Sequence, residues 1–186
     1  KTDGSPVVKL GDGTPYDLSA DGKSVLAVVA STPPQVVIYP TGAGEPRHLD
    51  GGGLENVESA QWFPNGDSIL ICGNEPATAT RFYVQDLAGG PPRAVTPPGT
   101  NSGKLSPDGK LVLAKGPDAK YSRYSLSGGE PRSIPWLSEF ERLICWTADG
   151  RSVLVSSDAM IPSRVERVDL ETGRRTLFKE IVPPDR

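Results

Sequence analysis

The chain has 186 residues and a formal net charge of −3, from 20 Lys and Arg residues against 23 Asp and Glu residues. This balance and the scattered positions of the arginines argue against a nucleic-acid partner, because a phosphate-binding surface needs a basic patch. The 21 glycines and 19 prolines predict many short strands and tight turns, while the recurring Val, Leu and Ile runs exclude a disordered chain.

An Asp-Gly or Asn-Gly dipeptide recurs along the sequence at Asp21-Gly22, Asn65-Gly66, Asp108-Gly109 and Asp149-Gly150. The spacings between successive dipeptides are 44, 43 and 41 residues. Each dipeptide closes a tetrad such as Ser106-Pro107-Asp108-Gly109, in which Pro presets φ, Asp accepts backbone hydrogen bonds and Gly adopts a positive φ. The tetrad predicts a hairpin turn, and a period of this length predicts one four-stranded β-propeller blade per repeat.

In chain order, the first predicted element is a strand over 5–10, which has the sequence of a fourth strand with no first three strands before it. We predict that it is the fourth strand of a preceding blade, so that the chain begins inside a blade. Four nearly complete blades follow at about 14–50, 57–96, 101–135 and 142–179. The predicted fold is therefore all-β, a single β-propeller domain over 1–186 built from blades of four antiparallel strands.

Within each blade the turn tetrad precedes an apolar second strand rich in β-branched residues, predicted at 24–30, 68–72, 111–115 and 152–156. The third strands are predicted at 35–39, 81–86, 122–126 and 164–170. A glycine turn such as Gly129-Glu130-Pro131-Arg132 then opens each short fourth strand. Pro is acceptable there because an outer edge strand needs no partner for that backbone position.

The tetrad Ser106-Pro107-Asp108-Gly109, the apolar strand after it and the later Gly-Gly-Glu-Pro-Arg together resemble the TolB-type, WD-repeat-like β-propeller family. The resemblance covers nearly the whole chain. It implies a segment of a larger bacterial propeller, usually of about six to eight blades, in a periplasmic or extracellular protein. In that family such propellers also accompany hydrolase domains and form the outer regions of receptor kinases.

Because strands of a blade alternate in direction, the tight turns are expected on one face of the propeller and the variable loops on the other. Loops that vary on a constant scaffold are where specificity is expected. The variable loops contain large apolar side chains beside carboxylates, and we predict a partner-binding surface formed by Glu75, Trp136, Glu139, Phe140 and Met160. The alternative is that Trp136 and Phe140 cover the gap between two blades and that the loop glutamates, which include Glu55, Glu58 and Glu141, are simply solvated.

Catalytic and metal-binding patterns are missing from the sequence. His48 is the single histidine, predicted in a fourth strand, and no Gly-x-Ser-x-Gly motif presents a serine nucleophile. Cys72 and Cys145 lie in different repeats and are predicted to be buried free thiols, not a disulfide or a zinc site. We predict no cofactor and no metal, no enzyme activity, and no membrane span within this segment.

The sequence is compatible with three functions. The first is a non-catalytic binding or sensing module that recognises a protein, peptide or envelope ligand, in one form the outer region of a bacterial receptor kinase. The second is a propeller that gates a separate α/β-hydrolase (peptidase) domain. The third is a structural module that completes a ring by oligomerisation.

Overall fold

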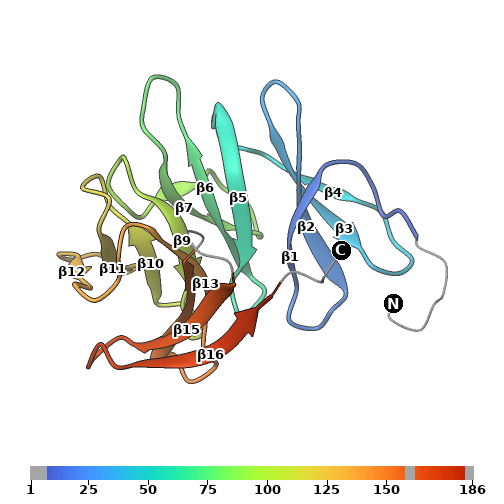
Figure 1. Cartoon of the computed structure of the whole chain (residues 1–186). Helices are drawn as coiled ribbons and strands as arrows, with labels where there is room; N and C mark the ends of the chain where they lie inside the picture. The colour runs from blue at the N-terminus through green and yellow to red at the C-terminus, as the bar shows by residue number, and fades with distance from the viewer. Residues whose placement is uncertain (1–7, 158–161, 183–186) are drawn as a thin grey trace.

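The computed structural model describes residues 8–157 and 162–182. Over these residues the chain forms sixteen strands and no helix, arranged as four antiparallel sheets of four strands each (Figure 1). In every sheet the strands follow one another in sequence order, so each pairs with its neighbours in the chain. The predicted all-β fold with blades of four antiparallel strands is confirmed.

Each sheet is one blade, numbered here from the N-terminus. Blade 1 contains β1 (Thr14–Leu18), β2 (Ser24–Val29), β3 (Gln35–Pro40) and β4 (Arg47–Leu49). Blade 2 contains β5 (Asn56–Trp62), β6 (Ser68–Asn74), β7 (Arg81–Asp86) and β8 (Arg93–Ala94). Blade 3 contains β9 (Asn101–Leu105), β10 (Leu111–Lys115), β11 (Tyr121–Ser125) and β12 (Arg132–Ser133). Blade 4 contains β13 (Glu141–Trp146), β14 (Ser152–Ser157), β15 (Ser163–Asp169) and β16 (Arg175–Ile181).

The repeated tetrad forms the turn between the first two strands of each blade. In blade 3 the Ser106 hydroxyl donates to Asp108 Oδ1 (2.6 Å) and accepts the Leu111 N–H (3.0 Å), while Asp108 Oδ1 also accepts the Lys110 N–H (3.1 Å). Gly109 has φ +69°, which a glycine adopts without strain. The bond from the Asp or Asn side chain to the N–H two residues further on recurs at all four turns and helps the chain to reverse there, whereas blade 2 has Phe63 in place of the hydroxyl residue.

The hydrophobic core lies between consecutive blades. The second and third strands supply most of it, and the side chains of one face pack on the next blade while those of the other face pack on the blade before. Three clusters of buried side chains result, between blades 1 and 2, blades 2 and 3, and blades 3 and 4. Leu26 and Ile69 belong to the first, Leu70 and Val112 to the second, and Leu113 and Val153 to the third.

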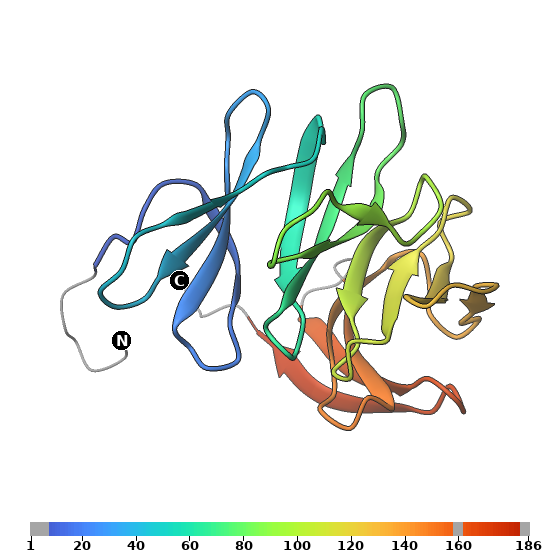
Figure 2. The same cartoon turned by 180° about the vertical axis from the view of Figure 1, so that it is seen from behind.

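Polar side chains tie the first strands of neighbouring blades together. Asp17 Oδ2 accepts the Trp62 N–H (2.8 Å), Gln61 Nε2 donates to the Gly103 carbonyl (3.1 Å), and Trp146 Nε1 donates to the Lys104 carbonyl (3.0 Å). Within residues 8–157 and 162–182, strands of blades 1 and 2 and of blades 3 and 4 lie side by side, and no contact of that extent joins a strand of blade 4 to a strand of blade 1. Figure 2 shows the same arrangement from behind.

The far face of blade 1, which faces away from blade 2, is covered by the N-terminal segment 8–13. Ala27, Val37 and Tyr39 are buried on this face. The Tyr39 hydroxyl donates to the Asp12 carbonyl (3.0 Å), and Gly11 lies so close to the Tyr39 ring that an added Cβ would be 2.1 Å from Cε1. Of the strand predicted over 5–10, residues 5–7 lie outside the described part of the chain, and residues 8–10 are in no strand.

The two cysteines are free, as predicted, but only one of them is buried. Cys72 lies in the cluster between blades 2 and 3, where burial and the nearby Glu58 raise its pKa to about 12. Cys145 is exposed, so the prediction of two buried thiols is wrong for this residue. Cys145 lies opposite Leu154 in the β13–β14 ladder, and neither residue belongs to the cluster of side chains between blades 3 and 4.

Candidate binding surface

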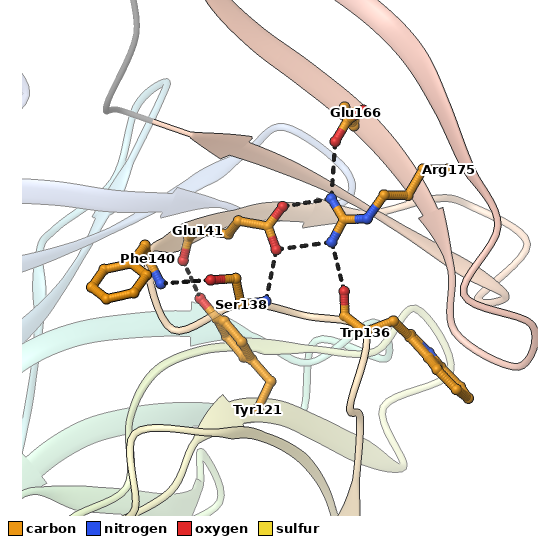
Figure 3. Close-up of polar contacts among 7 residues, drawn as sticks. All are labelled: Tyr121, Trp136, Ser138, Phe140, Glu141, Glu166 and Arg175. Atoms are coloured by element: carbon orange, nitrogen blue, oxygen red, sulfur yellow. Dashed lines mark hydrogen bonds and ion pairs between the residues drawn. The ribbon is translucent and has the colours of Figure 1, made fainter.

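The link between β12 and β13, residues 134–140, carries three of the predicted site residues and joins blade 3 to blade 4. Its apolar residues Ile134 and Leu137 are buried in the cluster between these blades. Its polar contacts centre on Glu141, the first residue of β13, and on Arg175, the first residue of β16 (Figure 3).

Glu141 and Arg175 form a two-point ion pair. Arg175 Nη1 lies 2.6 Å from Glu141 Oε1, and Arg175 Nη2 lies 3.0 Å from Glu141 Oε2. Arg175 also donates to Glu166 Oε2 (2.9 Å) and to the Trp136 carbonyl (2.6 Å). The Glu141 carboxylate accepts the Ser138 N–H (2.8 Å), so the ion pair holds the link at two backbone positions.

Burial acts to raise the pKa of Glu141, which is only 9% exposed. The hydrogen bonds from Arg175 and from the Ser138 N–H outweigh burial, and the pKa of Glu141 lies below its ordinary value. The pair is therefore ionised at neutral pH, and it fixes the link where the two blades meet.

Blade 3 holds the link from the other side. The Tyr121 hydroxyl donates to the Glu141 carbonyl (2.9 Å), and Lys115 Nζ donates to the Glu139 carbonyl (2.7 Å) while lying 5.3 Å from the centre of the Tyr121 ring. The Phe140 N–H donates to the Ser138 hydroxyl (3.2 Å). The backbone on both sides of Phe140 is thus bonded to ordered strands.

Phe140 is 80% exposed, and its ring points away from the Glu141–Arg175 pair (Figure 3). The Glu139 side chain beside it is also exposed. Trp136 is different, because its indole Nε1 donates to the Leu170 carbonyl (3.1 Å) and its ring lies against Gly173, leaving it 37% exposed. The two link aromatics therefore lie in different surroundings, Trp136 on the β15–β16 turn and Phe140 in solvent.

Glu75 lies at the start of the loop between β6 and β7, in blade 2, and makes contacts within its own hairpin. It forms an ion pair with Arg81 and accepts a hydrogen bond from the Tyr83 hydroxyl (3.2 Å). Arg81 also lies over the Tyr83 ring, with 5.2 Å from the guanidinium carbon to the ring centre. The structure brings Trp136, Glu139 and Phe140 together on one link and places Glu75 in a separate blade, while Met160 lies outside the described residues.

Sequence reasoning did not identify Arg175, Lys115 or Tyr121 as parts of this surface. The fourth strands each begin with an arginine, at Arg47, Arg93, Arg132 and Arg175, and this repetition was the available signal. Arg47 makes a similar bridge, since it donates to the Leu87 carbonyl of the next blade. At two of these four positions, Arg47 and Arg175, the arginine at the start of an outer strand joins separate segments of the chain.

Within the described residues, no group of three or more His, Cys, Asp or Glu side chains is placed to hold a metal ion. His48 lies in β4, exposed, with Nδ1 3.0 Å from Gln35 Oε1. No helix that could span a membrane occurs in the part of the chain that the structure describes.

Neither protein-family models nor curated protein sequences gave a match to this chain. Several solved structures, in contrast, match the fold of this chain. A putative TolB from Agrobacterium tumefaciens has a TM-score of 0.69 at 19% identity, over 90% of this chain and 61% of that one. The chain has a TolB-type β-propeller fold.

TolB from Acinetobacter baumannii matches this propeller with a TM-score of 0.72 at 17% identity, over 94% of this chain and 45% of that one. A prolyl endopeptidase matches with a TM-score of 0.57 at 19% identity, over 93% of this chain and 29% of that one. The chain thus spans between 29% and 61% of the length of these structures. At such low identity the matches establish the fold and leave activity and partners to be inferred.

Proposed function

We propose that this propeller is a non-catalytic binding module that recognises a protein or peptide through the link between blades 3 and 4. The observation that carries the proposal is Phe140, a large aromatic side chain that is 80% exposed on a backbone held from both blades. Aromatic anchors of this kind supply a large part of the binding energy in protein interfaces. A fixed backbone adds to affinity because little conformational freedom is lost on binding.

The chemistry around Phe140 favours a particular kind of ligand. Glu139 places an exposed carboxylate next to the ring. A segment that fits this surface has an apolar pocket or side chain for Phe140 and a basic residue for Glu139. The resemblance to TolB proteins supports a protein or peptide ligand and a location outside the cytoplasm, and a receptor-kinase outer region is one form that such a module takes.

A second candidate is a propeller that gates a separate hydrolase domain. The match to a prolyl endopeptidase favours it, because this chain aligns with 29% of that enzyme over 93% of its own length. In that case, a Gly-x-Ser-x-Gly motif with later Asp and His residues would be found in the same protein outside the propeller.

The test uses peptides selected from a random displayed library against the purified chain. Phe140→Ala should weaken binding of the selected peptides by about tenfold or more, equivalent to about 1.4 kcal/mol, as measured by titration calorimetry. The thermal unfolding midpoint should hardly change, because the ring contacts little of the fold. Glu139→Gln should weaken only those peptides that carry a basic residue.

Phe178→Ala is the matched control, since Phe178 is also a well-exposed phenylalanine but lies on β16. It should leave peptide binding unchanged. Selected peptides that bind Phe140→Ala as tightly as the parent chain would show that the link is not the binding surface.

A further inference from the structure

The first hairpin turn of blade 2 differs chemically from those of the other three blades. Blades 1, 3 and 4 have an aspartate before the turn glycine, whereas blade 2 has Asn65 before Gly66. The sequence contains three other asparagines, and none of them precedes a glycine: Asn56, Asn74 and Asn101. In an Asn-Gly pair the backbone nitrogen of the glycine can attack the side-chain amide, because glycine has no side chain to obstruct ring closure.

The aspartates of the other turns are held by a hydroxyl that blade 2 lacks. In each case a hydroxyl donates to the carboxylate at 2.6 to 2.7 Å, in the pairs Ser19–Asp21, Ser106–Asp108 and Thr147–Asp149. Phe63 occupies the position of the hydroxyl residue in blade 2. In the described structure the Asn65 side chain makes one hydrogen bond, in which its Oδ1 accepts the Asp67 N–H at 3.2 Å. The Asn65 amide is therefore the least restrained of the four side chains.

The three aspartates are also poor targets for attack by a backbone nitrogen. A carboxylate would have to lose an oxide ion, whereas a side-chain amide releases ammonia. The hydrogen bonds from the turn hydroxyls hold the pKa of Asp21, Asp108 and Asp149 below the ordinary value, so these groups are ionised at neutral pH. The chemistry of the turn therefore singles out blade 2.

The surroundings of Asn65 leave room for the reaction. Asn65 and Gly66 are both exposed, and a Cβ built on Gly66 would meet nothing within 4 Å. The Gly66 N–H donates to the Phe63 carbonyl at 3.0 Å, and the equivalent bonds of the other three turns are slightly shorter, at 2.8 to 2.9 Å. This backbone bond is thus common to all four turns, and the side chain makes the difference.

We propose that Asn65 is a site of spontaneous covalent modification, at which the turn of blade 2 converts to aspartate or isoaspartate. The Gly66 nitrogen loses its proton and bonds to Asn65 Cγ, the amide C–N bond breaks, and the amide nitrogen leaves as ammonia. Water then opens the five-membered imide at either carbonyl. The net reaction consumes one water, releases one ammonia and adds one negative charge. The Phe140 link takes no part, so either proposal can fail alone.

The two products affect the fold differently. Aspartate gives blade 2 the residue that the other three turns carry. Isoaspartate routes the backbone through the former side chain and lengthens the tight turn by one methylene. Because Phe63 and Pro64 lie against Gly109 of blade 3, the longer turn should disturb the packing between blades 2 and 3.

The test incubates the purified chain at mildly alkaline pH and follows each asparagine by peptide mass spectrometry. A synthetic peptide of residues 60–70 is the unfolded reference. When this peptide is half converted, Asn65 of the folded chain should show clear conversion while Asn56, Asn74 and Asn101 remain intact. An Asn65 that stays intact while the peptide converts fully, or that converts no faster than Asn101, would overturn the proposal.

Asp21→Asn is the matched variant, because Gly22 and Gly66 have similar φ values, +71° and +75°, and open surroundings. With the Ser19 hydroxyl present, position 21 should convert about fivefold more slowly than Asn65, which corresponds to about 1 kcal/mol, the net value of one hydrogen bond. Adding Ser19→Ala should remove the difference. Equal rates at positions 21 and 65 in Asp21→Asn would overturn the role assigned to the missing hydroxyl.

Thermal unfolding separates the effects of the two products. The isoaspartate form, purified from the aged chain, should unfold at a lower temperature than the Asn65→Asp variant, which reproduces the other product. Equal midpoints would overturn the effect on packing between blades 2 and 3.

Discussion

Glu141 is the residue on which the geometry of the link depends. Its carboxylate binds Arg175 at two points and accepts the Ser138 N–H, so a single charged group connects β13, β16 and the link. Replacing the carboxylate by an amide would leave Arg175 with Glu166 as its remaining ion-pair partner and would remove one of the two oxygens that Glu141 offers it. Partly buried charged groups that lose a hydrogen-bonded partner are costly to the folded state.

Glu141→Gln should therefore lower the free energy of unfolding by about 1.5–3 kcal/mol, the range for hydrogen bonds to charged groups. Urea unfolding followed by tryptophan fluorescence measures this change. Glu180→Gln is the matched control, because its ion pair with Arg164 is exposed and should contribute less than about 1 kcal/mol. Equal effects of the two substitutions would show that the Glu141 pair does not hold the link.

The same pair predicts a dependence on acid pH. The pKa of Glu141 is lower in the folded chain than its ordinary value of 4.5, so its contribution to stability is complete above that value. The contribution is lost as pH falls through the folded pKa. The stability difference between the parent chain and Glu141→Gln should consequently shrink as urea unfolding is repeated from pH 6 down to about pH 3. A difference that stays constant over this range would contradict the depressed pKa.

For single residues, only part of the candidate binding surface could be predicted from the sequence. Phe140, Glu139 and Trp136 could be identified as a loop group because large apolar side chains beside carboxylates are unusual there. Their orientations could not, because Arg175, which contacts the Trp136 carbonyl and Glu141, lies more than thirty residues further along the chain. Glu75 was grouped with them by composition alone, and its partner Arg81 belongs to its own hairpin.

Among the elements, the first hairpin turn of each blade is the best determined by sequence. Its glycines have nearly equal φ values, +71° at Gly22 and +69° at Gly109. Their surroundings differ, because a Cβ at Gly22 would meet nothing within 4 Å, whereas one at Gly109 would lie 3.2 Å from Pro64 and 3.3 Å from Phe63 of the preceding blade. Substitution at Gly22 therefore tests the cost of the backbone conformation alone, whereas substitution at Gly109 adds the cost of disturbing the packing between blades.

Gly22→Ala should lower the free energy of unfolding by about 1 kcal/mol, the cost of placing a side chain at positive φ. Gly109→Ala should cost more, because Phe63 and Pro64 must also move. Urea unfolding of both variants measures the comparison. If Gly109→Ala is as stable as Gly22→Ala, Phe63 and Pro64 can move aside without lowering the free energy of unfolding.

The second and third strands could be predicted to within a residue or two, because turn residues bracket apolar runs of the right length. The fourth strands were harder, and they range from the two residues of β8 to the seven of β16. Their length depends on how the third strand pairs, which local sequence does not encode. The segment 8–10, predicted as a strand, runs instead into the turn that covers Tyr39.

At the scale of the whole molecule, the period of the repeat predicted four blades, and the structure stacks them so that the core is divided among three interfaces. Each interface belongs to two neighbouring blades, which makes stability close to a sum of blades and nearest-neighbour contacts. The sequence could not predict how far the stack curves, because curvature depends on packing between residues far apart in the chain.

The path of the chain through these blades has a mechanical consequence. Consecutive blades are joined by one crossing of the backbone, and the first and last blades hold the two ends of the described chain. Under load from both ends, an outer blade can detach without breaking the interfaces beyond its neighbour. Force spectroscopy should record successive ruptures, each lengthening the tether by roughly 140 Å for the 41 to 44 residues of one repeat. A single rupture of the whole chain would instead show that the four blades unfold together as one cooperative unit.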